Sequence, residues 1–94
     1  MSTRTRLSIP DDVVSREVDG ARVLTSLSAG GFTRLDDVGE EIWRAVEEGN
    51  SIDQIVTRIT ARYEVPAEQC RREVEGFLRD LAQRRLIAFD EDAQ

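Results

Sequence analysis

The side chains that could perform acid–base or metal chemistry in this sequence are almost all carboxylates. In the predicted helical region they include the adjacent pairs Asp36-Asp37, Glu40-Glu41 and Glu47-Glu48. Each pair lies beside a predicted helix start or on a predicted outer helix face, where a hydrated surface explains it better than a catalytic pair. The sequence contains no histidine, so the usual general base and the commonest metal ligand are both missing.

The remaining reactive groups do not form a recognisable active site. Cys70 is the single cysteine, which excludes an internal disulfide and a multi-cysteine zinc site. Its position among helical core residues predicts a small buried side chain rather than a reactive thiol. The Ala-Gly-Gly segment 29–31 lacks the Lys-Ser or Lys-Thr of a phosphate-binding loop, and there is no nucleophile elbow. We therefore expect a protein that is not an enzyme and that uses no metal or cofactor.

Charge and hydropathy narrow the classes of partner. The 94 residues carry a net charge of −6, which disfavours binding to a phosphate backbone because that binding depends on Lys and Arg. No apolar run approaches the roughly 18 residues that cross a bilayer, and the first ten residues lack the apolar centre of a secretion signal. The sequence predicts a cytoplasmic protein without a nucleic-acid or membrane partner.

Strand-like alternation dominates the first third of the chain. Segments 13–18 and 21–27 flank Asp19-Gly20, a pair that predicts a tight hairpin because both central residues of a type I′ turn need positive φ. A second turn at 28–31 leads to a predicted third strand at 32–35. Residues 7–9 also alternate and predict a short strand that Pro10 ends.

From Asp36 onward the apolar spacing becomes helical and predicts three helices. The first is capped by Asp36 or Asp37 and ends before Gly49, the second is capped by Ser51, and the third has Pro66 in its first turn. Their apolar stripes are Val38, Ile42, Trp43 and Val46; then Ile52, Ile55, Val56, Ile59 and Tyr63; then Cys70, Val74, Phe77, Leu78 and Leu81.

This order of elements predicts an α+β, winged-helix-like fold. An N-terminal three-stranded antiparallel sheet is followed by a three-helix bundle, and packing one on the other hides the apolar side of each. We expect a single domain over residues 7–89, with a short extended segment at 86–89 as its end. Residues 1–6 and the acidic residues 90–94 are predicted to be flexible.

A helix–turn–helix arrangement is also typical of DNA-binding regulators, whose recognition helix carries a basic stripe. Segment 67–84 carries four arginines, but it also carries four carboxylates: Arg71, Arg72, Arg79 and Arg84 against Glu68, Glu73, Glu75 and Asp80. Together with the net charge of −6, this balance disfavours a DNA-binding regulator.

With these elements placed, residues 7–89 resemble the PqqD-like domains, also called recognition elements of ribosomally made, modified peptides. The pattern is most similar to the discrete leader-binding proteins of lasso-peptide clusters. In the first half it comprises Asp19-Gly20, Val23-Leu24, Gly31, Leu35-Asp36, Gly39, Ile42-Trp43 and Gly49. In the second half it comprises Ile52, Ile55-Val56, Tyr63-Glu64-Val65, Glu73-Val74, Phe77-Leu78 and Leu81.

The resemblance implies a non-catalytic adaptor. A precursor leader peptide would dock as an extra strand on the third strand, against the third helix, and would be delivered to a leader protease and a cyclase. An alternative is a PqqD-like peptide chaperone for another modifying enzyme, such as a radical SAM enzyme. Both readings share one peptide-binding groove and differ in their client enzymes.

A predicted groove follows from this mode of binding and from helix geometry. The edge strand supplies Gly31, Phe32, Thr33, Arg34 and Leu35, with Phe32 and Arg34 on one face and Thr33 and Leu35 on the other. On the third helix, the apolar stripe widens on the side of Arg71 and Glu75. We expect Val74 and Leu78 to form the floor, Phe32 the opposite wall, and Arg34, Arg71 and Glu75 the rim. The competing interpretation places Phe32 and Leu78 in the ordinary core.

Overall fold

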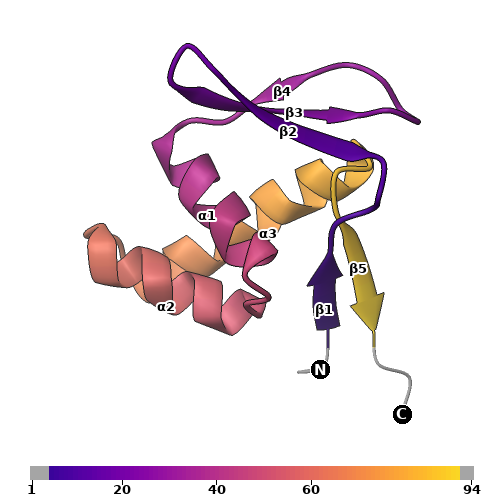
Figure 1. Ribbon diagram of the computed structural model, residues 1–94. Helices are drawn as coiled ribbons and strands as arrows, with labels where there is room; N and C mark the ends of the chain where they lie inside the picture. Colours follow the sequence, from indigo (N-terminus) through magenta and orange to yellow (C-terminus); the bar gives the residue numbers. More distant parts are fainter. Residues whose placement is uncertain (1–4, 92–94) are drawn as a thin grey trace.

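The computed structural model describes residues 5–91 and shows an antiparallel sheet with three helices on one side of it (Figure 1). The sheet contains β2 (Val13–Val18), β3 (Ala21–Ser26) and β4 (Thr33–Arg34), in the order β2-β3-β4. The helices are α1 (Asp37–Glu47), α2 (Ile52–Arg62) and α3 (Ala67–Gln83). The predicted α+β arrangement, a three-stranded sheet followed by three helices, is confirmed.

The hairpin between β2 and β3 forms where Asp19-Gly20 predicted it. Asp19 has φ 51° and Gly20 has φ 80°, the two positive values that a type I′ turn requires. The turn fixes the register, with Val18 opposite Ala21 and Val13 opposite Ser26. This register directs Leu24 to the helices, where its side chain is fully buried.

Helix boundaries are set by polar caps that the sequence predicted. Asp36 accepts a hydrogen bond of 2.7 Å from the Gly39 amide at the start of α1. Ser51 begins α2 with a reciprocal pair of bonds to Gln54, the capping box. Gly49 ends α1 with φ 86°, a left-handed conformation that glycine adopts without a Cβ penalty. Pro66 differs slightly from its predicted place because α3 begins one residue later.

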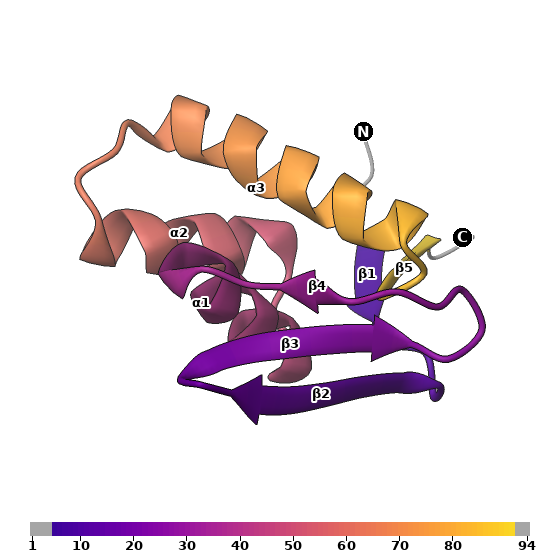
Figure 2. The ribbon, with the colours of Figure 1, turned by 90° about the horizontal axis from the view of Figure 1, so that it is seen from above.

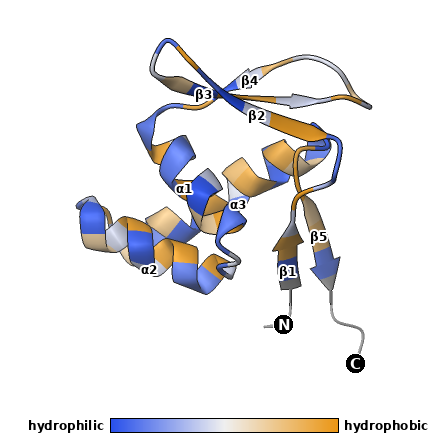
Figure 3. Cartoon of the chain, in the orientation of Figure 1, coloured by the Kyte–Doolittle hydropathy of each residue, from blue (hydrophilic) through white to orange (hydrophobic). Residues whose placement is uncertain are grey.

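The core lies where the sheet meets the helices and between the helices themselves. In Figure 3 hydrophilic and hydrophobic segments alternate along the helices, as expected for helices with one buried side. Trp43 is almost completely buried, and its indole N–H donates to Glu47 at 3.0 Å. The buried apolar set is Leu24, Leu35, Ile42, Trp43, Ala45, Val46, Ile55, Val56, Ile59, Cys70, Val74, Leu78, Leu81, Leu86 and Ile87.

A two-stranded ribbon joins the ends of the described chain. β1 (Thr5–Ser8) pairs antiparallel with β5 (Ala88–Glu91), and the Ser8 hydroxyl donates to Asp90 at 2.8 Å. The sequence predicted short extended segments here but not their pairing. It also predicted residues 1–6 and 90–94 to be flexible, whereas residues 5, 6, 90 and 91 belong to strands. The other residues of those two predicted segments lie outside the described part.

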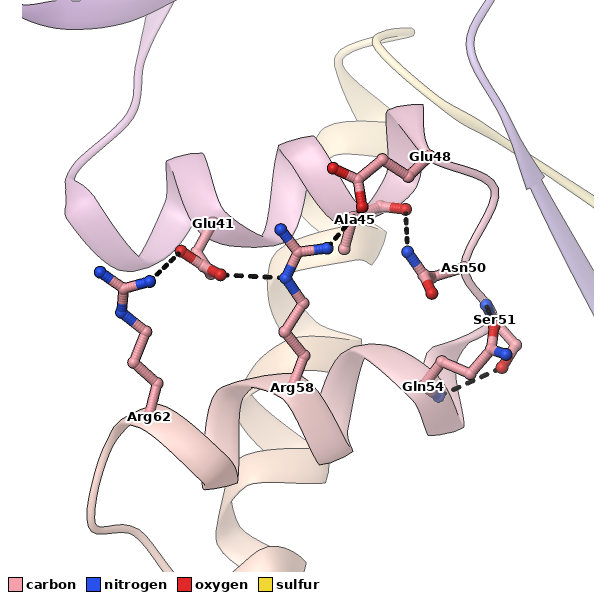
Figure 4. A network of polar contacts seen from close by, with 8 residues as sticks. All are labelled: Glu41, Ala45, Glu48, Asn50, Ser51, Gln54, Arg58 and Arg62. Carbon is pink, nitrogen blue, oxygen red and sulfur yellow. Dashed lines mark hydrogen bonds and ion pairs between the residues drawn. The ribbon is translucent and has the colours of Figure 1, made fainter.

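Ion pairs across the α1–α2 junction hold these two helices together (Figure 4). Arg58 on α2 donates to Glu41 at 3.0 Å and to Glu48 at 2.7 Å, and Arg62 lies 3.5 Å from Glu41. These hydrogen bonds raise the pKa of the Arg58 guanidinium. The sequence predicted a fully exposed acidic face on the first helix, but Glu41 is partly covered by these pairings.

Candidate functional site

The outer edge of β4 is the most distinctive backbone feature of the sheet. The Leu35 amide donates to the Arg22 carbonyl at 2.9 Å, so Leu35 and, two residues earlier, Thr33 bond toward β3. Arg34 and, by the same alternation, Phe32 direct their backbone N–H and C=O groups away from β3. Among residues 5–91, β4 has no strand on that side. Two alternate residues therefore present unpaired backbone groups to an incoming strand.

Helix α3 runs along the β4 side of the sheet, opposite β2 (Figure 2). Helix α3 packs mainly against α2, and β4 lies mainly against β3. Side chains of α3 and of the residue after it contact β4 at one place and the first turn of α1 at another. Arg84, just after α3, donates to the Thr33 hydroxyl at 3.4 Å, and the Phe77 ring lies under Gly39, 3.2 Å from where a Cβ would stand.

An apolar pocket of about 390 Å³ opens at the carboxyl end of β4. It lies among the first turns of α1, the end of α2 and the first half of α3. The apolar pocket is lined by Val38, Ile42, Ile59, Val65, Val74 and Phe77, together with Tyr63, Gly39 and Cys70. Two carboxylates, Asp36 and Glu73, complete the lining. Its size and apolar walls suit the hydrocarbon part of one side chain of a bound peptide.

A second pocket of about 240 Å³ lies at the amino end of β4. We call it the arginine pocket because Arg84 is the one charged residue in its lining among the described residues. The 29–33 segment forms one wall, Leu24 and Ser26 form the floor, and Leu86 lies beside Arg84. The two pockets therefore lie at opposite ends of the same edge strand.

The five residues predicted on the edge strand occupy the predicted segment. Phe32 is 79% exposed, Arg34 is exposed, Thr33 is half-buried and Leu35 is buried. This alternation agrees with the predicted faces. Gly31 precedes the strand with φ 79°, a left-handed conformation that favours glycine. The exposure of Phe32 also separates it from the core, against the competing interpretation.

The structure does not bring the residues predicted on α3 together beside β4. Arg71 pairs with Asp53 on α2 and with Glu75 at 3.6 Å, which places these two side chains on the flank of α3 that faces α2. The Asp53 hydrogen bond raises the pKa of the Arg71 guanidinium. Leu78 is 0% exposed and Val74 is 2% exposed, so Leu78 is a core residue, whereas Val74 contributes to both core and pocket.

The opposite flank of α3 borders the apolar pocket and leads to Arg84, which contacts Thr33 of β4, and it was not singled out from the sequence. At 100° per residue, Glu73, Phe77 and Arg84 lie on the side of Val74 away from Arg71 and Glu75. Glu73 and Phe77 line the apolar pocket, and Arg84 lines the arginine pocket. The signal available in the sequence was Phe77 itself, because it widens the apolar stripe on that side.

The single thiol, that of Cys70, is buried. Cys70 is buried in the wall of the apolar pocket, and burial raises the pKa of its thiol, with Glu73 adding to the effect. This confirms the predicted buried side chain. Within residues 5–91 no group of three or more potential metal-ligating side chains occurs, and no helix is long and apolar enough to cross a membrane.

Comparison with known proteins shows a match to one family model and similarity to two solved structures. The family model described as coenzyme PQQ synthesis protein D (PqqD) matches residues 21–87. The structure described as TbiB1 in complex with the TbiA(beta) leader peptide superposes with a TM-score of 0.80 at 38% identity, covering 93% of this chain and 99% of that chain. A lasso peptide synthetase B1 complexed with the leader peptide shares the fold, with a TM-score of 0.81 at 18% identity, covering 87% of this chain and 96% of that one. None of the curated proteins matches the chain.

Proposed function

Because the chain belongs to the PqqD family, we propose that it binds the leader segment of a ribosomally made precursor peptide as an added strand on β4. The observation that carries the proposal is the unpaired β4 edge with a pocket at each end. Backbone pairing gives affinity with little demand on sequence, and pockets for alternate side chains give selectivity. The 38% identical TbiB1, whose structure is in complex with a leader peptide, supports this reading.

The proposed site is a revision of the groove predicted from sequence. We retain Gly31, Phe32, Thr33, Arg34 and Leu35 as the docking strand, and Val74 as part of the pocket wall. We replace the rim of Arg71, Glu75 and Leu78 by the flank that carries Glu73, Phe77 and Arg84. The reason is that Arg71 pairs with Asp53 on α2, whereas Glu73 and Phe77 line the apolar pocket and Arg84 contacts Thr33 of β4.

In the proposed pathway the protein is a non-catalytic cytoplasmic adaptor that delivers the leader-bearing precursor to a leader protease and a cyclase of a lasso-peptide type. Holding the leader raises the local concentration of the precursor near the enzyme, provided that both are bound at once. Delivery therefore needs an enzyme-facing surface separate from β4. The acidic face of α1 is partly engaged by α2, so we expect its exposed members Asp37 and Glu47, rather than Glu41, to be available for that contact.

A binding titration tests the proposal. Fluorescently labelled TbiA(beta) leader peptide serves as the probe, with polarisation as the readout, and we expect saturable binding. Val38→Asp puts a charge at the mouth of the apolar pocket and should weaken binding at least about tenfold, the effect of about 1.4 kcal/mol. Val18→Asp is the matched control because Val18 is also an exposed valine but lies on β2, on the far side of β3 from β4, and lines neither pocket.

Delivery is tested separately by cleavage. We expect a purified lasso-type leader protease to cleave its precursor faster when the protein is present, and Val38→Asp to remove the acceleration. Equal weakening by Val38→Asp and Val18→Asp would contradict binding at the pocket. Tight binding without faster cleavage would contradict delivery and leave the peptide-binding role intact.

A further inference from the structure

The two pockets at the ends of β4 differ in charge. Asp36 and Glu73 line the apolar pocket, and none of the described residues that line it is basic. Arg84 lines the arginine pocket, and none of the described residues that line it is acidic. A strand bound along β4 therefore passes from an acidic end to a basic end, although the whole chain carries a net charge of −6.

The acidic end retains hydrogen-bonding capacity for a guest. One oxygen of Asp36 accepts from the Gly39 amide at 2.7 Å, and one oxygen of Glu73 accepts from the Gln69 side chain at 3.2 Å. A carboxylate offers about four lone-pair positions, so each group has acceptors left over. The apolar walls of the pocket suit the hydrocarbon stem of a long basic side chain, whose charged tip would reach the carboxylates.

The basic end, at the arginine pocket, also retains hydrogen-bonding capacity for a guest. The Arg84 guanidinium donates to the Asp80 carboxylate at 3.2 Å and to the Thr33 hydroxyl at 3.4 Å. A guanidinium carries five N–H donors, so these two bonds leave donors for a guest carboxylate. The Arg84–Asp80 pair is half-exposed and spans one helical turn, and such pairs are weak enough for a ligand to compete with them.

We propose, on the basis of the proposed strand addition, that the opposite charges of the two pockets select which peptide sequences bind. We call this selection the sequence filter of the site. The guest strand carries Lys or Arg in the apolar pocket and Asp or Glu in the arginine pocket. The pockets flank residues 32–36, and an extended guest rises about 3.3 Å per residue, so the two guest side chains are about four residues apart. An even spacing also places both side chains on the same face of the guest strand.

This filter fixes the direction in which the guest lies along β4. Backbone pairing alone accepts a strand in either direction, because parallel and antiparallel ladders both satisfy the edge. A guest with the opposite charge order would place its carboxylate beside Asp36 and Glu73 and its cation beside Arg84. Both ends would then meet like charge, which disfavours the reversed orientation.

A charge scan of the probe tests the inference. Single Glu and single Lys substitutions are made at every position of the TbiA(beta) leader peptide, and each peptide is titrated against wild type, Arg84→Gln and Glu73→Gln. Arg79→Gln and Glu68→Gln serve as matched controls because both residues are exposed on α3 and line neither pocket. Neutral replacements change charge with little change in size.

We expect one probe position at which Glu binds wild type more tightly than Lys by about threefold or more, the range of a partly exposed ion pair. This preference should disappear in Arg84→Gln and persist in Arg79→Gln. About four residues away, a second position should prefer Lys, and that preference should weaken in Glu73→Gln, where Asp36 still lines the pocket, and remain unchanged in Glu68→Gln.

Charge preferences that are the same in wild type and in both pocket variants would overturn the inference while leaving strand addition in place. Two preferences that both depend on one pocket would overturn it as well. Absence of binding by the parent probe and by every scan variant would overturn the proposed function, and the inference with it.

Discussion

At the scale of single residues, the adjacent residues Phe77 and Leu78 on α3 have different environments. Leu78 is fully buried in the core, whereas Phe77 is half-buried and lines the apolar pocket. A helical wheel drawn from the sequence shows both as apolar and cannot tell which flank meets the sheet edge. The sequence therefore predicted the apolar stripe of α3, but it did not predict that Arg71 on the chosen flank pairs with Asp53 on α2.

A substitution at Leu78 separates core from groove. We expect Leu78→Asp to unfold the protein, because an unpaired carboxylate would replace a fully buried side chain. The far-ultraviolet circular dichroism and the fluorescence of the single tryptophan, Trp43, report unfolding. A folded Leu78→Asp variant with lost peptide binding would instead support the groove predicted from sequence.

The thiol of Cys70 gives a pH prediction. Burial raises its pKa above the ordinary value of 9.0, so above that pH the unfolded chain loses the proton while the folded chain keeps it. The folded state then binds more protons than the unfolded state, and stability falls as the pH rises. We expect the urea midpoint of wild type to fall more between about pH 8 and about pH 10 than that of Cys70→Ala. Parallel pH profiles for the two proteins would refute this assignment.

At the scale of elements, local sequence signals predicted the turns and helix caps correctly, but the pairing of strands distant in sequence was not predicted. Asp19-Gly20 determines its hairpin, and Ser51 and Asp36 cap their helices, through contacts within a few residues. The β1–β5 ribbon joins segments about eighty residues apart in sequence. Each strand is short and lacks a turn signal that would reveal its partner. Long-range pairing is therefore the part of the fold that the sequence leaves open.

The capping box of α2 gives an element-scale prediction. Ser51→Ala removes the acceptor for the Gln54 amide and should lower the free energy of unfolding by about 1 kcal/mol. Chemical denaturation monitored by Trp43 fluorescence measures the change. Thr57→Ala is the control, because Thr57 is exposed within the same helix and plays no part in the cap. An equal loss in both variants would argue against the cap as the cause.

At the scale of the whole molecule, the outer edge of β4 has no partner strand among residues 5–91. The helices cover one side of the sheet, β3 covers one edge of β4, and the ribbon joins the two ends of the described chain elsewhere (Figure 1). What remains unpaired at β4 is backbone, and the proposed recognition of a peptide rests on this feature.

Amide hydrogen exchange at β4 tests this central claim most directly. In the free protein, the Arg34 and Phe32 amides should exchange rapidly, and the Leu35 and Thr33 amides should be protected by β3. Saturation with the TbiA(beta) leader peptide should protect Arg34 and Phe32 and leave the other two unchanged. Bound peptide with Arg34 and Phe32 still exchanging at their free rates would contradict strand addition at this edge.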